Sequence, residues 1–252
     1  MYRGFNLDLD MDFQDYKNYG NLLYSSNSRN IQNSLNKYIS IDGSLRASRM
    51  MNDWFPSIKT DVFISHSHED KDIAINLSGW LWKKFKLKSF VDSCVWGHAD
   101  SLIKIIDKKY CKIEGNTFEY TCRNFSTSHV HNMLCSALTM MIDKTECLFF
   151  LNTPNSITTK DTLESTYSPW LYYETTISQI IRKKKRSEHR VLNEQKMTKI
   201  GSYNKGFKIE YNLSLDHLIQ IDKVNLDLWE KVFKTKIKQY PLDTLYNLNP
   251  IK

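Results

Sequence analysis

Three short apolar segments and the helical pattern between them organise the chain from residue 60 onward. Residues 61–65 and 88–92 are β-branched and aromatic runs, and residues 147–151 are apolar throughout, which is typical of buried parallel strands. Between the first two runs, apolar residues recur at helical spacing over 73–85. A strand, a helix and a strand within 32 residues predict a βαβ unit with a right-handed crossover.

The same patterns predict the remaining elements. Helices are expected over 102–106, 129–142, 170–181 and 226–237, and strands over 207–213 and 219–221. Ser126, Thr127 or Ser128 is placed to cap the second of these helices, and Pro169 suits the first turn of the third. Residues 93–98 indicate a loop, and residues 111–128, which lack clear periodicity, indicate an insertion.

The strands and helices together predict a doubly wound α/β domain over residues 60–240. Residues 1–59 are polar and rich in Asn and Ser, so we expect a partly helical N-terminal extension, which Pro56 ends. Residues 241–252 are expected to form a C-terminal tail.

Composition and charge exclude several classes of protein. Among the 252 residues are 12 Phe, 14 Tyr and 6 Trp, which is too much core material for a disordered chain. The apolar run at 147–151 is far shorter than a bilayer span, so we expect no membrane segment. Residues 181–210 carry the whole net charge of +7, concentrated at 182–186. We interpret that run as a solvated helix end, which makes nucleic-acid binding unlikely.

The cysteines indicate a reducing, cytoplasmic setting. They are odd in number, widely spaced and contain no C-x-x-C pair, so they predict neither a disulfide framework nor a zinc ribbon. The set Cys122, His129, His131 and Cys135 matches no common zinc spacing, and we expect no metal site. No secretory signal is recognisable at the N-terminus.

The loops that follow the predicted strands are the first place to look for a ligand, because parallel sheets bind ligands at the carboxyl ends of their strands. These loops are residues 65–70, 93–100 and 152–174. They contain no G-x-G-x-x-G, no G-x-x-x-x-G-K-[ST] and no H-E-x-x-H. Rossmann dehydrogenases, P-loop phosphotransferases and zinc proteases are therefore disfavoured.

Two motifs resemble a known family. The run TDVFISHSHEDK at 60–71 looks like the first strand and loop of bacterial TIR (Toll/interleukin-1 receptor) domains, and residues 90–92 match their second strand. The sequence SPWLYYE at 168–174 is similar to the family motif S-x-W-x-x-x-E. Trp170 and Glu174 are four residues apart, which places them on one helix face. The resemblance covers about residues 61–181, and the loop after Asp92 lacks the proline that the family often has there.

The resemblance implies a flavodoxin-like fold with a mostly parallel five-stranded sheet. It also implies cleavage of the bond between nicotinamide and ribose in NAD, which is a substrate here and not a resident cofactor. Glu174 takes the position of the catalytic glutamate. One carboxylate suffices, since nicotinamide leaves as a neutral molecule and the sugar that remains is cationic.

Six further residues are expected to bind the substrate, each with a simpler alternative. Ser65 and Ser67 are placed to receive the pyrophosphate or only to cap a helix. The other four, which are expected to line the pocket, are His66, Asp92, Trp96 and Trp170. In the simpler alternative, His66 is only a loop residue and Asp92 only the end of a strand. Trp96 is then an anchor of an interface, and Trp170 a core residue. Glu174 itself is either catalytic or a solvated helix residue.

The family context implies antiphage defence, self-association through TIR surfaces, and a nucleotide product that reaches a separate effector protein. Two other functions stay open. A non-catalytic TIR module would only bind other TIR domains, and it needs no carboxylate facing a pocket. An enzyme acting on the glycosyl bond of another nucleoside, such as a deoxyribosyltransferase, would use a related sheet and a glutamate.

Overall fold

The computed structural model describes most of the chain: residues 1–9, 11–27, 35–41, 43–55, 58–160, 163–166, 168–190, 211–212, 214–236 and 239–250. Within these ranges, no helix combines the length and the apolar composition that a bilayer crossing requires.

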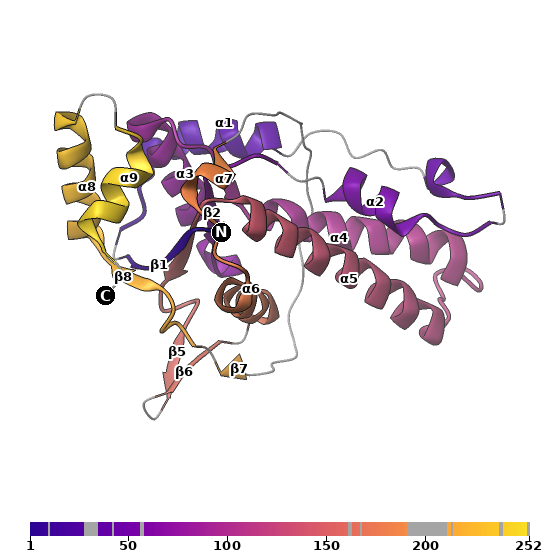
Figure 1. Cartoon of the computed structure of the whole chain (residues 1–252). Coiled ribbons are helices and arrows are strands. Elements are labelled where there is room, and N and C mark those ends of the chain that lie inside the picture. Colours follow the sequence, from indigo (N-terminus) through magenta and orange to yellow (C-terminus); the bar gives the residue numbers. More distant parts are fainter. Residues whose placement is uncertain are drawn as a thin grey trace.

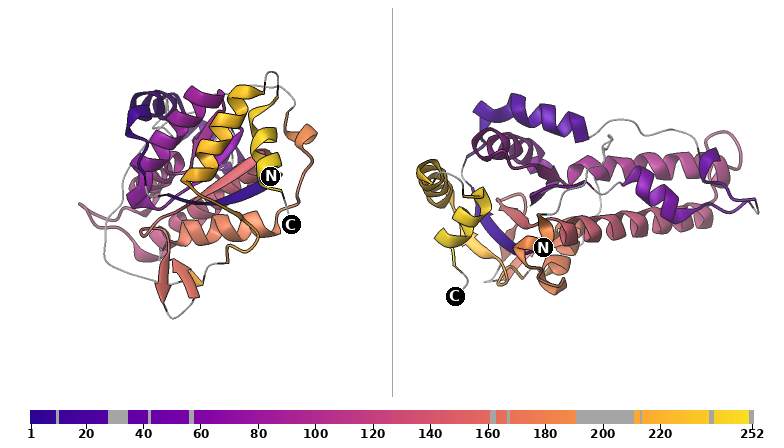
Figure 2. Two further views of the ribbon diagram at one scale, coloured as in Figure 1. Left: turned by 90° about the vertical axis from the view of Figure 1, so that its left-hand side faces the viewer. Right: turned by 45° about the horizontal axis from the view of Figure 1, so that its top comes forward.

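Five parallel strands form the central sheet, in the order β3-β2-β4-β1-β8. Figure 1 labels β1, β2 and β8 of this sheet. Their bounds are β1 Arg3–Asp8, β2 Val62–Ser65, β3 Ser89–Val91, β4 Cys147–Asn152 and β8 Ile219–Ile221. Helices cover both faces of the sheet (Figure 2), and the predicted flavodoxin-like, doubly wound α/β fold is therefore confirmed.

The strand β1 differs from the expectation for residues 1–59. It is no part of an extension, because it pairs with β4 on one side and with β8 on the other. Phe5 and Leu7 are fully buried in it, and the Arg3 guanidinium donates hydrogen bonds to the carbonyls of Tyr246 and Asn249, at 2.9 and 2.8 Å. In the sequence, this strand is indicated only by the alternation of Phe5, Leu7 and Leu9, and a strand of six residues is too short for a longer pattern.

Helices α3 (Lys71–Phe85), α8 (Lys223–Thr235) and α9 (Pro241–Leu248) pack on one face of the sheet through aromatic rings. The rings of Phe85 and Trp229 stack with centroids 3.9 Å apart, and Phe5 contacts Tyr246 of α9. Residues 241–248 are thus a packed helix and not the expected tail. Helix α1 (Lys17–Asn27) packs on the outer side of α3. Residues 1–59 are therefore partly helical, as the sequence predicted.

Helices α2 (Ala47–Trp54), α4 (Ser93–Ile106) and α5 (Tyr120–Lys144) extend together away from the sheet (Figures 1 and 2). The π-helix η4 (Asp107–Cys111) continues α4. The predicted loop at 93–98 is wrong, because α4 begins directly after β3. The insertion at 111–128 is also partly helical: the side chain of Glu119 caps α5, and not one of the three predicted hydroxyl residues.

A disulfide joins Cys111 to Cys122 at the far end of these helices. The sequence predicted no disulfide framework, and this bond is a correction to that expectation. Two cysteines separated by eleven residues gave no recognisable framework, because the turn that brings them together is visible only in three dimensions. Cys94, Cys135 and Cys147 form no disulfide.

The remaining elements lie around this body. A small antiparallel sheet contains β5 (Thr158–Lys160), β6 (Leu163–Thr166) and β7 (Tyr211–Asn212), so the predicted strand at 207–213 belongs in part to this second sheet. Its residues 207–210 lie outside the described residues. The helices not yet named are α6 Pro169–Ile180 and α7 Arg186–His189, with single turns at η1 Gln14–Tyr16, η2 Asn36–Tyr38 and η3 His68–Asp70.

The basic run at 182–186 is solvated in part, since Arg182, Lys183 and Lys185 are exposed, but two of its residues form ion pairs with distant parts of the chain. Lys184 pairs with Asp143, and Arg186 pairs with Asp243. Arg190 contacts both Glu146, at 2.7 Å, and Asp243, at 2.9 Å. The ion pairs of Arg186 and Arg190 therefore connect α7 to the start of β4 and to α9.

Candidate active site

Glu174 lies at the carboxyl ends of β2 and β3, where the sequence placed the ligand site. Ser65 is the last residue of β2, and Asp92 follows β3 as the N-cap of α4. Glu174 comes from α6, whose start is fixed by the Ser168 hydroxyl, which accepts a hydrogen bond from the Leu171 N–H, and by Pro169 in the first turn. Residues from three separate parts of the chain therefore meet at one edge of the sheet.

A buried chain of polar contacts connects these residues. The Ser65 hydroxyl donates to Oε2 of Glu174 at 2.6 Å, and His66 Nδ1 lies 2.5 Å from Oδ1 of Asp92. The same Asp92 oxygen accepts from the Ser93 N–H at 2.7 Å. His66, Asp92 and Glu174 have no exposed surface, and Ser65 is 1% exposed. We call Ser65, His66, Asp92 and Glu174 the carboxyl cluster.

Burial and mutual repulsion change the acidity of this cluster. Burial raises the pKa of Glu174 well above its ordinary value, and the negative charge of Asp92 and a hydrogen bond to it raise that pKa further. Burial raises the pKa of Asp92 to about 8. The pKa of His66 falls to about 4, mainly because burial disfavours its charged form, so this imidazole is neutral at pH 7.

The structure decides between several of the alternatives for single residues. Glu174 is not a solvated helix residue, and His66 is not an exposed loop residue. Asp92 caps α4 and also belongs to the cluster. Ser65 bonds Glu174 rather than a helix end, and Ser67, which is 6% exposed, makes no side-chain cap hydrogen bond.

The two tryptophans have different outcomes. Trp170 is half-buried in the first turn of α6 and packs edge-to-face on His131 of α5, with centroids 5.6 Å apart. It therefore lines the boundary between α5 and α6, one turn before Glu174. Trp96 belongs to α4, but its side chain lies outside the described part of the chain.

A second polar group beside the cluster was missed in the sequence. Asp70, which is 1% exposed, accepts hydrogen bonds from the Thr153 hydroxyl at 2.5 Å and from the Asn155 amide at 2.8 Å. These bonds join the loop after β2 to the loop after β4. The turn chemistry at 152–156 was recognisable, but its partner, 83 residues earlier in the chain, was not.

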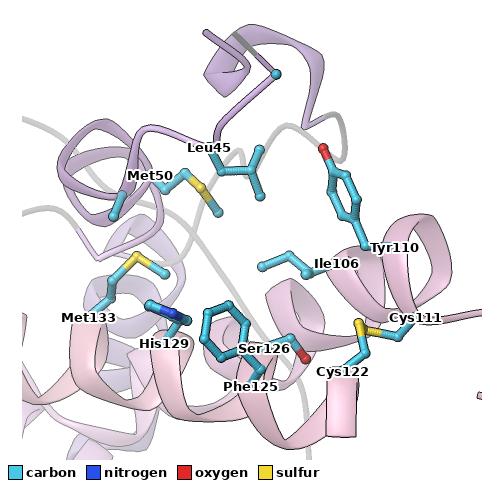
Figure 3. A pocket seen from close by; sticks show the side chains of 12 residues that line it. Leu45, Met50, Ile106, Tyr110, Cys111, Cys122, Phe125, Ser126, His129 and Met133 are labelled. Carbon is cyan, nitrogen blue, oxygen red and sulfur yellow. A yellow bond between two sulfur atoms is a disulfide. The ribbon is translucent and has the colours of Figure 1, made fainter. Parts of the chain in front are cut away.

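A cavity of about 430 Å³ lies elsewhere, between α2, η4 and α5 (Figure 3). Its walls are mainly apolar, and Figure 3 shows Leu45, Met50, Ile106, Phe125 and Met133 around it together with the disulfide. It offers no carboxylate and few donors for phosphate or ribose. The chemistry of the molecule is therefore concentrated in the carboxyl cluster.

The part of the chain that the structure describes contains no group of three or more histidine, cysteine or acidic side chains arranged for a metal ion. Cys122, one member of the set tested in the sequence, is bonded to Cys111 and is not available as a thiolate ligand. Comparisons with protein families, with curated proteins and with solved structures find no match to this chain.

Proposed function

We propose that this chain is a TIR-like enzyme that cleaves the bond between nicotinamide and ribose in NAD, with Glu174 as the catalytic carboxylate. The observation that carries the proposal is the position of Glu174. It is enclosed at the carboxyl ends of β2 and β3 and is hydrogen-bonded to Ser65. A buried carboxylate at this edge of an α/β sheet is where the motif resemblance puts the catalytic group.

The reaction needs one anionic group beneath the sugar. The C1′–N1 bond breaks, the electron pair goes to the pyridinium ring, and nicotinamide leaves neutral. The Glu174 carboxylate stabilises the oxocarbenium ion that forms. Water then adds to C1′ and loses a proton, which gives ADP-ribose; attack by another atom of the same nucleotide gives a cyclic product instead.

Two features of the site bear on how it works. The raised pKa of Glu174 favours its protonated form in the closed site, and this proton has to leave before the carboxyl can stabilise a cation. The cluster is also closed, since its members have almost no exposed surface. Substrate entry therefore requires a movement of the side chains over it, such as Trp170 at the boundary between α5 and α6.

The wider context of the proposal comes from the motif resemblance. The nucleotide product acts as a signal to a separate effector protein in antiphage defence, in the cytoplasm. Self-association opens or completes the site.

The test is nicotinamide release from NAD by the purified full chain, across protein concentrations and with a crowding agent that promotes assembly. Glu174→Gln removes the charge and keeps the shape, so we expect release to fall by at least a hundredfold. Glu188→Gln makes the same chemical change on exposed α7, where Glu188 pairs with Arg182, and it should leave the rate unchanged. Full activity in Glu174→Gln, or no release by the wild type under any of these conditions, would contradict the proposal.

A second candidate function, that of an interaction module, is favoured by one observation. Large apolar side chains are exposed around the start of α5: Tyr120 is 78% exposed, Phe125 67% and Ile113 66%. Exposed apolar groups that gather on one surface are typical of protein contacts. If the partner is a second copy of the chain, light scattering should show a dimer for the wild type and a monomer for Phe125→Ser. A wild type that is monomeric at all concentrations would exclude this interaction.

A further inference from the structure

We propose that Asp92 is a positioning residue that keeps a proton on Glu174 in the closed site, so that the catalytic carboxylate is generated only when the site opens or a cationic substrate enters. The inference rests on the proposed function of Glu174 and assigns a role to a neighbour that does not itself need to touch the sugar.

Burial raises the pKa of both carboxyls, and the contacts around Asp92 favour its anionic form over that of Glu174. Its Oδ1 atom lies 2.5 Å from His66 Nδ1 and accepts the Ser93 N–H at 2.7 Å. It also sits at the N-terminus of α4, a helix of 14 residues, where the helix dipole stabilises negative charge. The His66 imidazole, which is neutral at pH 7, lies against this oxygen through Nδ1.

Glu174 has less support for a negative charge. The Ser65 hydroxyl is the donor to its Oε2 atom, while its Oε1 atom and Oδ2 of Asp92 are both buried without a hydrogen-bond partner of another kind. The two side chains interact, and this interaction lowers the pKa of Asp92 and raises that of Glu174. A proton on Glu174, donated to Asp92, satisfies both of these oxygens at once. Two carboxylates in one buried site cannot both stay ionised.

The other groups around Glu174 do not replace this interaction. Titratable or charged groups on the neighbouring elements are His66 after β2, Asp70 and Lys71 at the start of α3, Asp92 after β3, Cys135 on α5 and Tyr173 on α6. Burial raises the pKa of the Cys135 thiol, so this thiol stays neutral. Asp92 is thus the group whose charge acts most directly on Glu174.

A cation reverses the balance. When the positively charged nicotinamide ring or the developing oxocarbenium ion lies against the pair, its charge favours two carboxylates over one, and Glu174 releases its proton to solvent. In the empty site the neutral carboxyl cannot stabilise a cation. The pair therefore links the charge of the substrate to the activity of Glu174.

The experiment is a titration of the Glu174 carboxyl by carbon-13 NMR in the full chain, assigned with Glu174→Gln, together with the pH dependence of kcat/KM for NAD. In the wild type we expect Glu174 to be protonated at pH 7. Asp92→Asn should lower its titration midpoint by about 1–2 pH units and move the acidic limb of kcat/KM by the same amount. Asp100→Asn, an equivalent change on the same helix near His131, should leave both unchanged.

The outcomes separate the two proposals. If both carboxyls are ionised at pH 7 in the wild type, or if the Glu174 midpoint does not move in Asp92→Asn, the role of Asp92 is overturned. The wild-type titration gives this answer even where the variant does not fold. Absence of nicotinamide release combined with the expected titration would instead remove the proposed reaction and keep the coupling of the two carboxyls.

Discussion

Full burial of an acidic side chain costs free energy unless its proton or its partners compensate for the lost water. Glu174 and Asp92 have the Ser65 hydroxyl and the His66 imidazole as neighbours, and the proposed proton shared by the two carboxyls would compensate for the rest. The arrangement resembles an active site more than a structural ion pair, because among the described residues no lysine or arginine pairs with either carboxyl, and both pKa values are raised.

The raised pKa values of the two carboxyls predict how stability depends on pH. Folding raises the pKa of Asp92 to about 8 and that of Glu174 well above its ordinary value, so the folded pair holds a proton that the unfolded chain has lost, and its contribution to stability falls as the pH rises. Asp92→Asn lowers the pKa of Glu174, so the wild type should lose stability relative to this variant as the pH rises from about 5 to 8. Urea unfolding of both proteins across this window measures the difference; parallel curves would show that the folded pair holds no proton.

Close approach of backbones determines how α1 sits on α3. A Cβ atom at Gly79 would lie 2.3 Å from the Tyr16 carbonyl oxygen, and one at Gly20 would lie 2.0 Å from the Ile75 carbonyl oxygen. Backbone atoms cannot move aside as a flexible side chain can. Both glycines are therefore required by this packing of the two helices, which covers the outside of the βαβ unit.

Gly79→Ala should force α1 and α3 apart and lower the free energy of unfolding by about 3 kcal/mol. Gly115→Asn is the control, because Gly115 has a left-handed conformation that asparagine tolerates and open space around the added side chain. Thermal unfolding of the two variants provides the comparison. Equal melting temperatures for Gly79→Ala and the wild type would mean that the two helices are not in close contact.

The disulfide stabilises the far end of the helical arm made by α4 and α5. Joining Cys111 to Cys122 closes a short loop, and the loss of that constraint in the unfolded chain predicts a stability decrease of about 3 kcal/mol for Cys111→Ser. Cys135 lies on α5, the helix of Cys122, and forms no disulfide, so Cys135→Ser should change stability little. Denaturation with and without a thiol reductant measures the effect; the reductant should destabilise the wild type and leave Cys111→Ser unchanged.

The molecule as a whole has the strand positions of a flavodoxin-like sheet but a different chain path. If β2 is numbered 1, β3 is 2 and β4 is 3, the sheet has the flavodoxin-like order 2-1-3-4-5. The fourth position in this order is occupied by β1, which comes from the N-terminus. This strand closes the core between β4 and β8. The folding unit therefore begins near residue 3 and not at residue 60.

Phe5→Ala should lower the free energy of unfolding by about 4 kcal/mol, because Phe5 is fully buried between Phe149 and Tyr246. Deletion of residues 1–9 should leave no cooperative unfolding transition, since it removes a central strand. Circular dichroism during heating measures both. A deletion variant that melts like the full chain would restore the interpretation of residues 1–59 as an extension.

The sequence was most informative where chemistry and periodicity coincide. Apolar runs predicted β2, β3 and β4, and the loops after them led to Ser65, His66, Asp92 and Glu174, which the structure brings together. What local patterns could not show are contacts between distant segments: β1 in the sheet, the disulfide, and the hydrogen bonds of Asp70 to the loop after β4. The roles of these residues depend on their partners, which a local window does not contain.

The most direct test of the account is a crystal structure of the Glu174→Gln variant with NAD, in which binding is retained and cleavage is prevented. We predict that the C1′ atom of the nicotinamide riboside lies about 3.5 Å from the side chain at position 174, with the carboxyl ends of β2 and β3 beneath the sugar. NAD bound at another place, such as the apolar cavity between α2 and α5, with the carboxyl cluster still closed, would contradict it.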